Sequence, residues 1–447
     1  MDSTLLIAIG VGIAVLLILI LRFKIQAFLA LLISSIVVGI IAGMEPYVIV
    51  QTIQKGMAST LGFVAVVVGL GAMFGAILEH SGGAEAVASF LLKRFKEKGT
   101  SWALMLTGFF IAIPVFFDVA FIILVPMIYS WRRKSKKSLL LYGIPLLAGL
   151  AITHSFIPPT PGPVAVADIL NADLGWVIVF GFIVGIPTAI ISGPLFGRYI
   201  AKRIHIDAPE LVEKINTPDA SRPSVGMIFA IIGLPIFLIV CNTVLNSPMA
   251  EGWVSEGVQS WLKMIGHPFF ALILANLIAW YLLGIRRGTS NKILQTITGK
   301  SLGPAGIIIL LTGAGGVFKQ MLIETGTGTM MADYFQELGL GIFAVAFILA
   351  ALVRMLQGSA KVAMITAAGV VAALLKAEPL NAMDTALLVI AIASGAAILS
   401  PVNDRGFWLV SKYLGMTEKQ TFRSWTMMTT ILSLVGITTV AILSLFV

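Results

Sequence analysis

The sequence has little charge. Asp, Glu, Lys and Arg make up 11% of its 447 residues, whereas 58% are hydrophobic and the mean hydropathy is +1.01. Soluble domains carry about twice that share of charge, so an ordinary soluble protein is excluded. Apolar runs of roughly 18–30 residues recur along the whole chain, which indicates a polytopic helical membrane protein. These runs are continuous rather than alternating, which excludes a transmembrane β-barrel.

Cysteine and catalytic motifs are also scarce. The single cysteine, Cys241, excludes an internal disulfide. No H-E-x-x-H pair and no nucleophile motif lies in an apolar run, so we predict no metal or cofactor and disfavour an intramembrane enzyme. The net charge of +9 resides in short loops between apolar runs, which is typical of cytoplasmic loops and not of a nucleic-acid partner. The N-terminus lacks a basic region and a cleavage site, so residues 4–21 are predicted to be a retained helix.

Most apolar runs have the length of one crossing. Two longer runs, 101–131 and 341–375, are interrupted by "IPVFFDVAF" and "RMLQGSAKV". Each is either one irregular crossing or a re-entrant hairpin that enters and leaves on the same side. We expect single crossings at about 4–21, 25–43, 60–79, 139–157, 175–197, 226–245, 268–285, 303–322, 384–400 and 424–446.

The distribution of Lys and Arg favours the hairpins. With two hairpins and ten crossings, 24 loop Lys and Arg fall on one side and three on the other. If both segments cross, the loops divide 11 against 16 and the asymmetry disappears. Because cytoplasmic loops are the basic ones, the sequence predicts two re-entrant hairpins in the cytoplasmic membrane, with both termini extracytoplasmic.

The two halves of the chain resemble each other. "GLGAMFGAILEHSGG" at 69–83 aligns with "GAGGVFKQMLIETGT" at 313–327, and the same offset of 244 places one hairpin on the other. Each half has five crossings, an odd number, so the second is inverted. We predict an all-α protein with a first repeat over 1–200, a cytoplasmic linker over 201–225 and a second repeat over 226–447. Inverted repeats with interrupted helices are typical of secondary transporters, which bind substrate near the midplane.

Four interrupted segments are predicted to converge. The hairpins contribute "PVFFDVAF" and "QGSAKVA", and two broken helices, at about 139–170 and 384–412, contribute "THSFIPPTPGP" and "SPVNDRGFW". Prolines stop helices, and the exposed backbone must face protein or an aqueous cavity, where helix N-termini favour an anion. The predicted substrate-binding residues are Thr153, His154, Thr160, Gly162, Gln357, Gly358, Ser359, Lys361, Ser400, Asn403 and Asp404.

Asp118 is the predicted proton carrier. It is the most isolated acidic residue, and burial among its neighbouring phenylalanines would favour the protonated form. The alternative is a structural carboxylate paired with Arg354 or Lys361. His154 is a second proton carrier or a hydrogen-bonded core histidine, and Lys361 either neutralises a substrate carboxylate or serves as the counter-ion of Asp118. Asp404 is either a site residue or a helix cap.

In that order and spacing, "FFDVAF", "THSFIPPTPGP", "QGSAKVA" and "SPVNDRGFWL" resemble the gluconate permease family of the ion transporter superfamily. The resemblance implies proton-coupled uptake of gluconate or a related small hydroxy acid, a scaffold with a transport domain, and a homodimer. Thr160, Lys361 and Pro401 stand where this family usually has histidine, threonine and histidine. Sodium coupling and other organic anions, such as glycerate or D-serine, therefore remain open alternatives.

Overall fold

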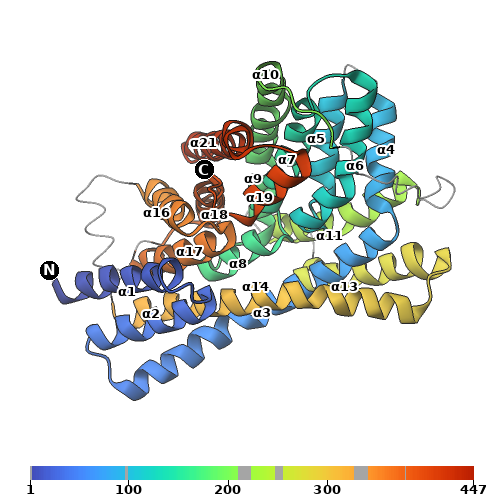
Figure 1. The fold of residues 1–447 in the computed structure, drawn as a ribbon. Coiled ribbons are helices and arrows are strands. Elements are labelled where there is room, and N and C mark those ends of the chain that lie inside the picture. The colour runs from blue at the N-terminus through green and yellow to red at the C-terminus, as the bar shows by residue number, and fades with distance from the viewer. Residues whose placement is uncertain (1–2, 96–98, 210–222, 247–254, 327–340, 378) are drawn as a thin grey trace.

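The computed structural model describes residues 3–95, 99–209, 223–246, 255–326, 341–377 and 379–447, and the regular elements within these ranges are helices (Figure 1). Outside these ranges lie most of the predicted linker, one end of the 313–327 match and residues 96–98 of "KRFKEK" (93–98), a segment that supplies four of the 24 basic loop residues. The helices are α1 Ser3–Leu21, α2 Ala27–Ile41, α3 Pro46–His80, α4 Gly83–Phe95, α5 Thr100–Ile111, α6 Phe117–Ser135, α7 Leu140–Phe156, α8 Pro161–Leu170, α9 Leu174–Ile190, α10 Phe196–Arg203, α11 Val225–Leu245, α12 Glu256–Gly266, α13 Pro268–Ala279, α14 Asn291–Glu324, α16 Ile342–Gln357, α17 Ala360–Ala377, α18 Ala382–Ala397, α19 Arg405–Leu414, α20 Glu418–Thr421 and α21 Met427–Leu443.

Two very long helices, α3 and α14, lie side by side along the bottom of the view in Figure 1. They are antiparallel, because Lys55 near the start of α3 bonds Glu324 at the end of α14, at 2.7 Å. Glycines permit the close approach: a Cβ on Gly56 would lie 2.7 Å from the Cα of Val317, and one on Gly316 would lie 2.1 Å from Thr60 Oγ1. The two helices therefore pack against each other at close distance.

Both of these helices are longer than predicted. The expected ranges 60–79 and 303–322 become helices of 35 and 34 residues. At 1.5 Å per residue each spans about 50 Å, well beyond a hydrocarbon core of about 30 Å. The prediction begins each helix after the polar residues of its first turns, because it places the membrane boundary there. Polar residues do not end a helix, however, and the helices continue through them. Two further helices, α4 and α12, were not predicted at all.

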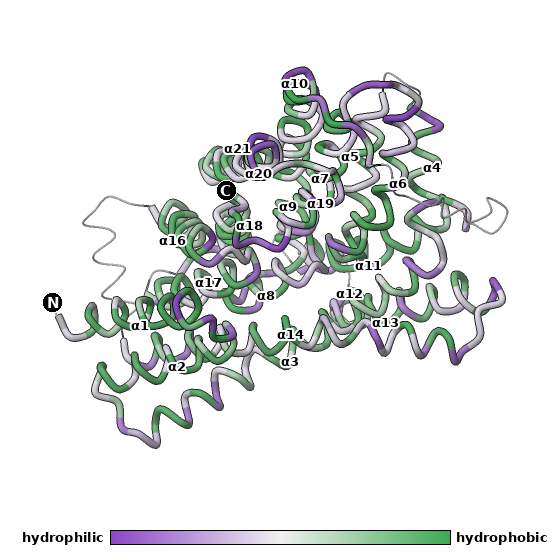
Figure 2. The backbone as a smooth tube through the Cα atoms, viewed as in Figure 1, coloured by the Kyte–Doolittle hydropathy of each residue, from purple (hydrophilic) through white to green (hydrophobic). Residues whose placement is uncertain are grey.

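Helix α2 packs on α14 and α13 packs on α3, and most of the other helices form a block over the α3–α14 pair. Helices α7, α17 and α18 are buried along nearly their whole length, and α8 contacts both α3 and α14. Figure 2 shows hydrophobic residues over most of the helices, and hydrophilic residues in α10 and between α18 and α19. Eight helices of the described chain are long and apolar enough to cross a membrane, and five shorter apolar helices accompany them.

Four interruptions occur where the sequence predicted them. They separate α5 from α6, α7 from α8, α16 from α17 and α18 from α19. Proline accounts for three of them, at Pro114, at Pro158–Pro159 and at Pro401, because each removes a backbone donor. The fourth is Gly358, whose φ of +85° is a left-handed conformation that favours glycine.

Candidate functional site

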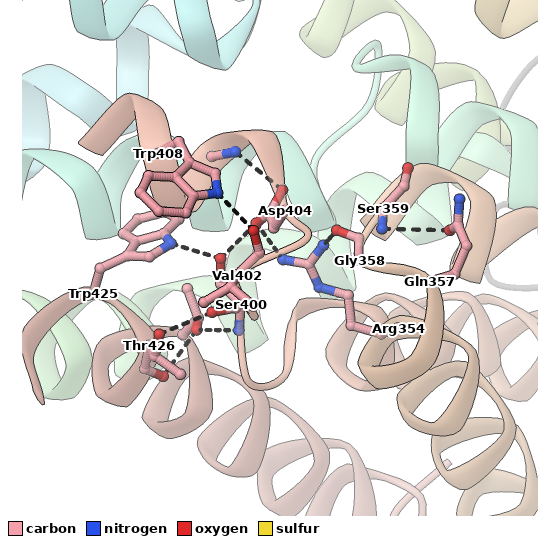
Figure 3. Close-up of polar contacts among 12 residues, drawn as sticks. Arg354, Gln357, Gly358, Ser359, Ser400, Val402, Asp404, Trp408, Trp425 and Thr426 are labelled. Atoms are coloured by element: carbon pink, nitrogen blue, oxygen red, sulfur yellow. Dashed lines mark hydrogen bonds and ion pairs between the residues drawn. The ribbon is translucent and has the colours of Figure 1, made fainter. Parts of the chain in front are cut away.

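The two interruptions of the second half are joined by one arginine (Figure 3). Arg354, in the last turn of α16, donates from Nη2 to Asp404 Oδ2 at 2.6 Å and from Nη1 to the Gly358 carbonyl. The Arg354 side chain is 5% exposed and that of Asp404 is 15% exposed. One guanidinium thus holds the turn between α16 and α17 against the segment between α18 and α19.

Asp404 also caps α19. Its Oδ1 accepts from the Gly406 amide at 3.0 Å, and its Oδ2 accepts from Ser400 Oγ at 2.5 Å. Asp404 is therefore the N-cap of α19, which is one of the two roles predicted for it. A carboxylate at a helix N-terminus also interacts favourably with the helix dipole. Asp404 therefore links Arg354, Ser400 and the first turn of α19 through one carboxylate.

Ser400 is fixed by the π-helical turn Phe422–Thr426 and by the start of α21. Trp425 Nε1 donates to Ser400 Oγ at 2.6 Å, and Thr426 Oγ1 donates to the Ser400 carbonyl at 2.8 Å. The Ser400 amide donates to Thr429 Oγ1 at 3.1 Å. In Figure 3 these residues surround the segment between α18 and α19. The backbone amide and carbonyl of Ser400 are therefore both satisfied by side chains, as buried backbone groups require.

The turn at Gly358 touches the other interruption. A Cβ at Gly358 would lie 2.7 Å from Cγ of Asn403 and 2.8 Å from the backbone of Asn403. There is therefore no room for a side chain, and this contact requires glycine in addition to the positive φ. Asn403 Nδ2 donates to the Leu356 carbonyl at 3.0 Å. Gln357 and Ser359 bond the turn itself: the Ser359 amide donates to Gln357 Oε1 at 3.3 Å, and the Val362 amide donates to Ser359 Oγ at 3.4 Å.

Hydrogen bonds from threonine hydroxyls to backbone carbonyls also stabilise the interruptions of the first half. Thr153 Oγ1 donates to the Phe109 carbonyl at 2.8 Å, and Thr160 Oγ1 donates to the Ile157 carbonyl at 2.6 Å. Both hydroxyls are buried and engaged with backbone. A Cβ on Gly162 would lie 2.8 Å from Met364 Sδ, so α8 packs closely on α17 of the second half.

Two adjoining cavities run between α3 and the first interruptions, and Pro114, Val115 and Phe116 line both. His154 and Thr160 line the inner cavity. The outer cavity is larger and reaches Glu79 and Ser301. Nδ1 of His154 is buried yet has no hydrogen-bond partner within the described chain, so it is free for a ligand hydroxyl.

Asp118 and Lys361 lie at the starts of α6 and α17. Contrary to the prediction of burial, the Asp118 side chain is exposed, because it stands in the first turn of α6 and faces outward while Phe121 is buried. The charges that act most strongly on it are Lys361, Asp404 and Arg405. The ammonium of Lys361 lies 5.7 Å from the centroid of the Phe116 ring, at the edge of the cavities.

The suggested pairing of Asp118 with Arg354 is wrong, because Arg354 is bound to Asp404. Within the described residues no ion pair of 4 Å or less joins Asp118 to Lys361 either. The predicted site did not include Arg405 or Phe116. It also did not include Arg354, which joins the two interruptions of the second half. A cation four residues before a glycine turn was the available signal for Arg354. In the described ranges, no group of three or more His, Cys, Asp or Glu side chains lies close enough to hold a metal.

Solved transporter structures share this fold. The YdaH transporter of Alcanivorax borkumensis aligns with a TM-score of 0.57 and 14% identity over 88% of each chain. MtrF of Neisseria gonorrhoeae aligns with a TM-score of 0.60 and 14% identity, over 88% of this chain and 83% of its own.

Sequence relatives extend over nearly the whole chain. The gluconate permease of Pseudomonas aeruginosa is 40% identical over 427 residues, which cover 95% of this chain and 94% of the relative. The low-affinity gluconate transporter of Escherichia coli K12 is 40% identical over 418 residues, and the Gnt-II system L-idonate transporter of the same strain is 36% identical over 416. Each match covers 93% of both chains.

The GntP family permease model matches residues 4–446. The relatives are permeases and transporters, and the structural neighbours are transporters, so this multi-pass membrane protein is a transport protein rather than an enzyme. The chain belongs to the GntP permease family.

Proposed function

We propose that this protein imports gluconate or a related small sugar acid across the cytoplasmic membrane by symport with a proton. The observation that carries the proposal is the meeting of helix interruptions from both halves. The two of the first half line a crevice beside α3, and α17 of the second half packs on them through Lys361 and Met364. The names of its relatives, gluconate permease and L-idonate transporter, support a sugar acid as the substrate.

The substrate carboxylate is recognised by positive charge. Helices α6, α8, α17 and α19 each begin at an interruption, and a helix N-terminus attracts an anion. Lys361 and Arg405 add full charges there, whereas Arg354 is neutralised by Asp404. The free Nδ1 of His154 suits a substrate hydroxyl. Gln357, Gly358, Ser359, Ser400 and Asn403 shape the site, because their polar groups bond the backbone around the interruptions.

Asp118 carries the proton in this proposal. Its side chain is exposed, which lets it exchange protons with water on whichever side is open. In the empty site the charges of Lys361 and Asp118 balance each other. A bound anion neutralises the cation and opposes an ionised carboxylate nearby, so the loaded site holds Asp118 protonated. His154 is the second candidate for the proton.

The architecture proposed is two inverted repeats, each with a re-entrant hairpin. The helix bounds support a repeat of 244 residues: moved by that offset, α3 falls on α14, α6 on α17, and α8 on α19. The hairpins are α5–α6 and α16–α17, and both termini lie outside, as the basic loops favour. In this proposal α3 and α14 belong to the scaffold of a homodimer, and the block above them is the transport domain.

The test is transport by the purified protein in proteoliposomes. Labelled gluconate should enter by counterflow and should accumulate when only an inward proton gradient is imposed. Asp118→Asn mimics the protonated form, so it should keep exchange and lose accumulation. If the variant still accumulates gluconate, the proton carrier is not Asp118 and His154 is the next residue to test. If a sodium gradient alone drives accumulation, proton coupling is overturned. Absence of gluconate counterflow, with glycerate or D-serine exchanged instead, would overturn the substrate.

A further inference from the structure

The side chains that line the outer cavity accept hydrogen bonds and offer none. Two of them carry polar atoms, Glu79 of α3 and Ser301 of α14, and the other lining side chains are apolar. Ser301 Oγ donates to the Thr298 carbonyl at 2.7 Å, so its proton is engaged and its lone pairs remain. An ionised carboxylate such as that of Glu79 only accepts. This cavity therefore suits a ligand group that has protons to donate.

Glu79 is free to meet such a ligand. Among the residues that the structure describes, its carboxylate has no hydrogen bond and no ion pair of 4 Å or less. It stands in the last turn of α3, where the partial negative charge of the helix end disfavours a carboxylate. The charge that acts on it there is that of Glu85, which is also negative. Neither the helix nor a protein partner accounts for an acid at this position.

The opposite charge lies at the helix interruptions. The ammonium of Lys361 is 5.7 Å from the centroid of the Phe116 ring, and Phe116 lines both cavities. Helix α6 begins directly after Phe116, and its N-terminus attracts an anion. The two cavities together therefore have a cationic side at the interruptions and an anionic side at Glu79. A hydroxy acid binds between them in one orientation, with its carboxylate at the interruptions.

We propose that Glu79 and Ser301 receive the hydroxyl end of the substrate, and that Glu79 excludes acids with a carboxylate at both ends. The inference rests on the proposed function, because it takes the first carboxylate to bind at the interruptions. A terminal hydroxyl donates its proton to either acceptor. A second carboxylate has no proton to donate and meets a like charge, which is unfavourable. Glu79 is therefore a specificity-determining residue of the outer cavity.

The experiment is competition in counterflow. Proteoliposomes exchange labelled gluconate against unlabelled gluconate or unlabelled glucarate, its counterpart with a carboxylate at both ends. For the wild type, glucarate should compete at least about tenfold less well than gluconate. Glu79→Gln removes the charge and supplies an amide donor, so glucarate should then compete within about threefold of gluconate.

Two further variants serve as controls. Glu79→Asp keeps the charge and should keep the exclusion of glucarate. Glu45→Gln changes an exposed acid at the other end of α3, whose side chain caps nothing, and should also leave the exclusion unchanged. Relief of the exclusion in Glu45→Gln would show an effect of overall charge and would overturn the local assignment.

The remaining outcomes separate the two proposals. Glucarate that competes as well as gluconate in the wild type would overturn the inference and leave the proposed function standing. Unchanged exclusion in Glu79→Gln would overturn the assignment of Glu79. If that variant does not fold, Ser301→Ala tests the same end of the cavity and should weaken gluconate binding about threefold; unchanged binding would overturn the inference. Exchange of neither acid would overturn the proposed function, and the inference with it.

Discussion

Replacing Arg354 should destabilise the protein far more than breaking an exposed ion pair. Arg354→Met removes the partner of a carboxylate whose side chain is 15% exposed. Breaking a buried ion pair costs about 3–5 kcal/mol, because the remaining charge stays withdrawn from water. Asp404 keeps its bonds to Ser400 and Gly406, which places the expected loss near the lower end, about 3 kcal/mol. The Gly358 carbonyl also loses its donor, for about 1 kcal/mol more.

A double-mutant cycle measures this coupling in denaturant unfolding of the detergent-solubilised protein. Arg354→Met combined with Asp404→Asn should be less destabilised than the two single variants predict together, by about 2 kcal/mol. The control is Lys55→Met, which breaks an ion pair of similar length whose side chains are 64% and 37% exposed. It should cost at most about 1 kcal/mol, because water screens that pair. Additivity within about 0.5 kcal/mol would refute the reasoning about Arg354.

Two further predictions concern packing and topology. A Cβ on Gly75 would lie 2.0 Å from the Pro114 carbonyl oxygen, so Gly75→Ala should displace the first interruption and lower the melting temperature and transport together. Gly62 has nothing within 4 Å, and Gly62→Ala in the same helix should stabilise by about 0.5–1 kcal/mol; equal melting temperatures for the two variants would contradict the packing. Cysteines at Ser89 and Ser135, placed singly in a cysteine-free background, should both resist an impermeant thiol reagent until the cells are lysed. Labelling of one from outside would show that α5–α6 crosses.

The sequence predicts the helix interruptions well because their causes are local. Proline lacks a donor wherever it stands, and Gly358 adopts a left-handed conformation that other residues avoid. It predicts helix lengths less well. The polar first turns of α3 were taken for a loop, yet a helix continues through them beside α14, and Lys55 bonds Glu324 there.

Tertiary contacts were the least predictable part of the site. Arg354 and Asp404 are 50 residues apart, and nothing in either segment specifies that they pair. The exposure of Asp118 is a similar case. Its apolar neighbours in sequence suggested burial, but the face on which a side chain lies depends on the turn at which the helix begins, and α6 begins one residue earlier, at Phe117.

The central claim is that the interruptions of both halves bound one substrate site, and protection of single cysteines tests it most directly. In a Cys241→Ala background, Val119→Cys lies on the cavity wall of the first half and Ser359→Cys lies in the turn of the second. Gluconate should slow thiol labelling at both positions and leave a half-exposed control at the end of α21, Ser444→Cys, unchanged. Protection at only one half, or at neither, in protein that still exchanges gluconate would contradict a shared site.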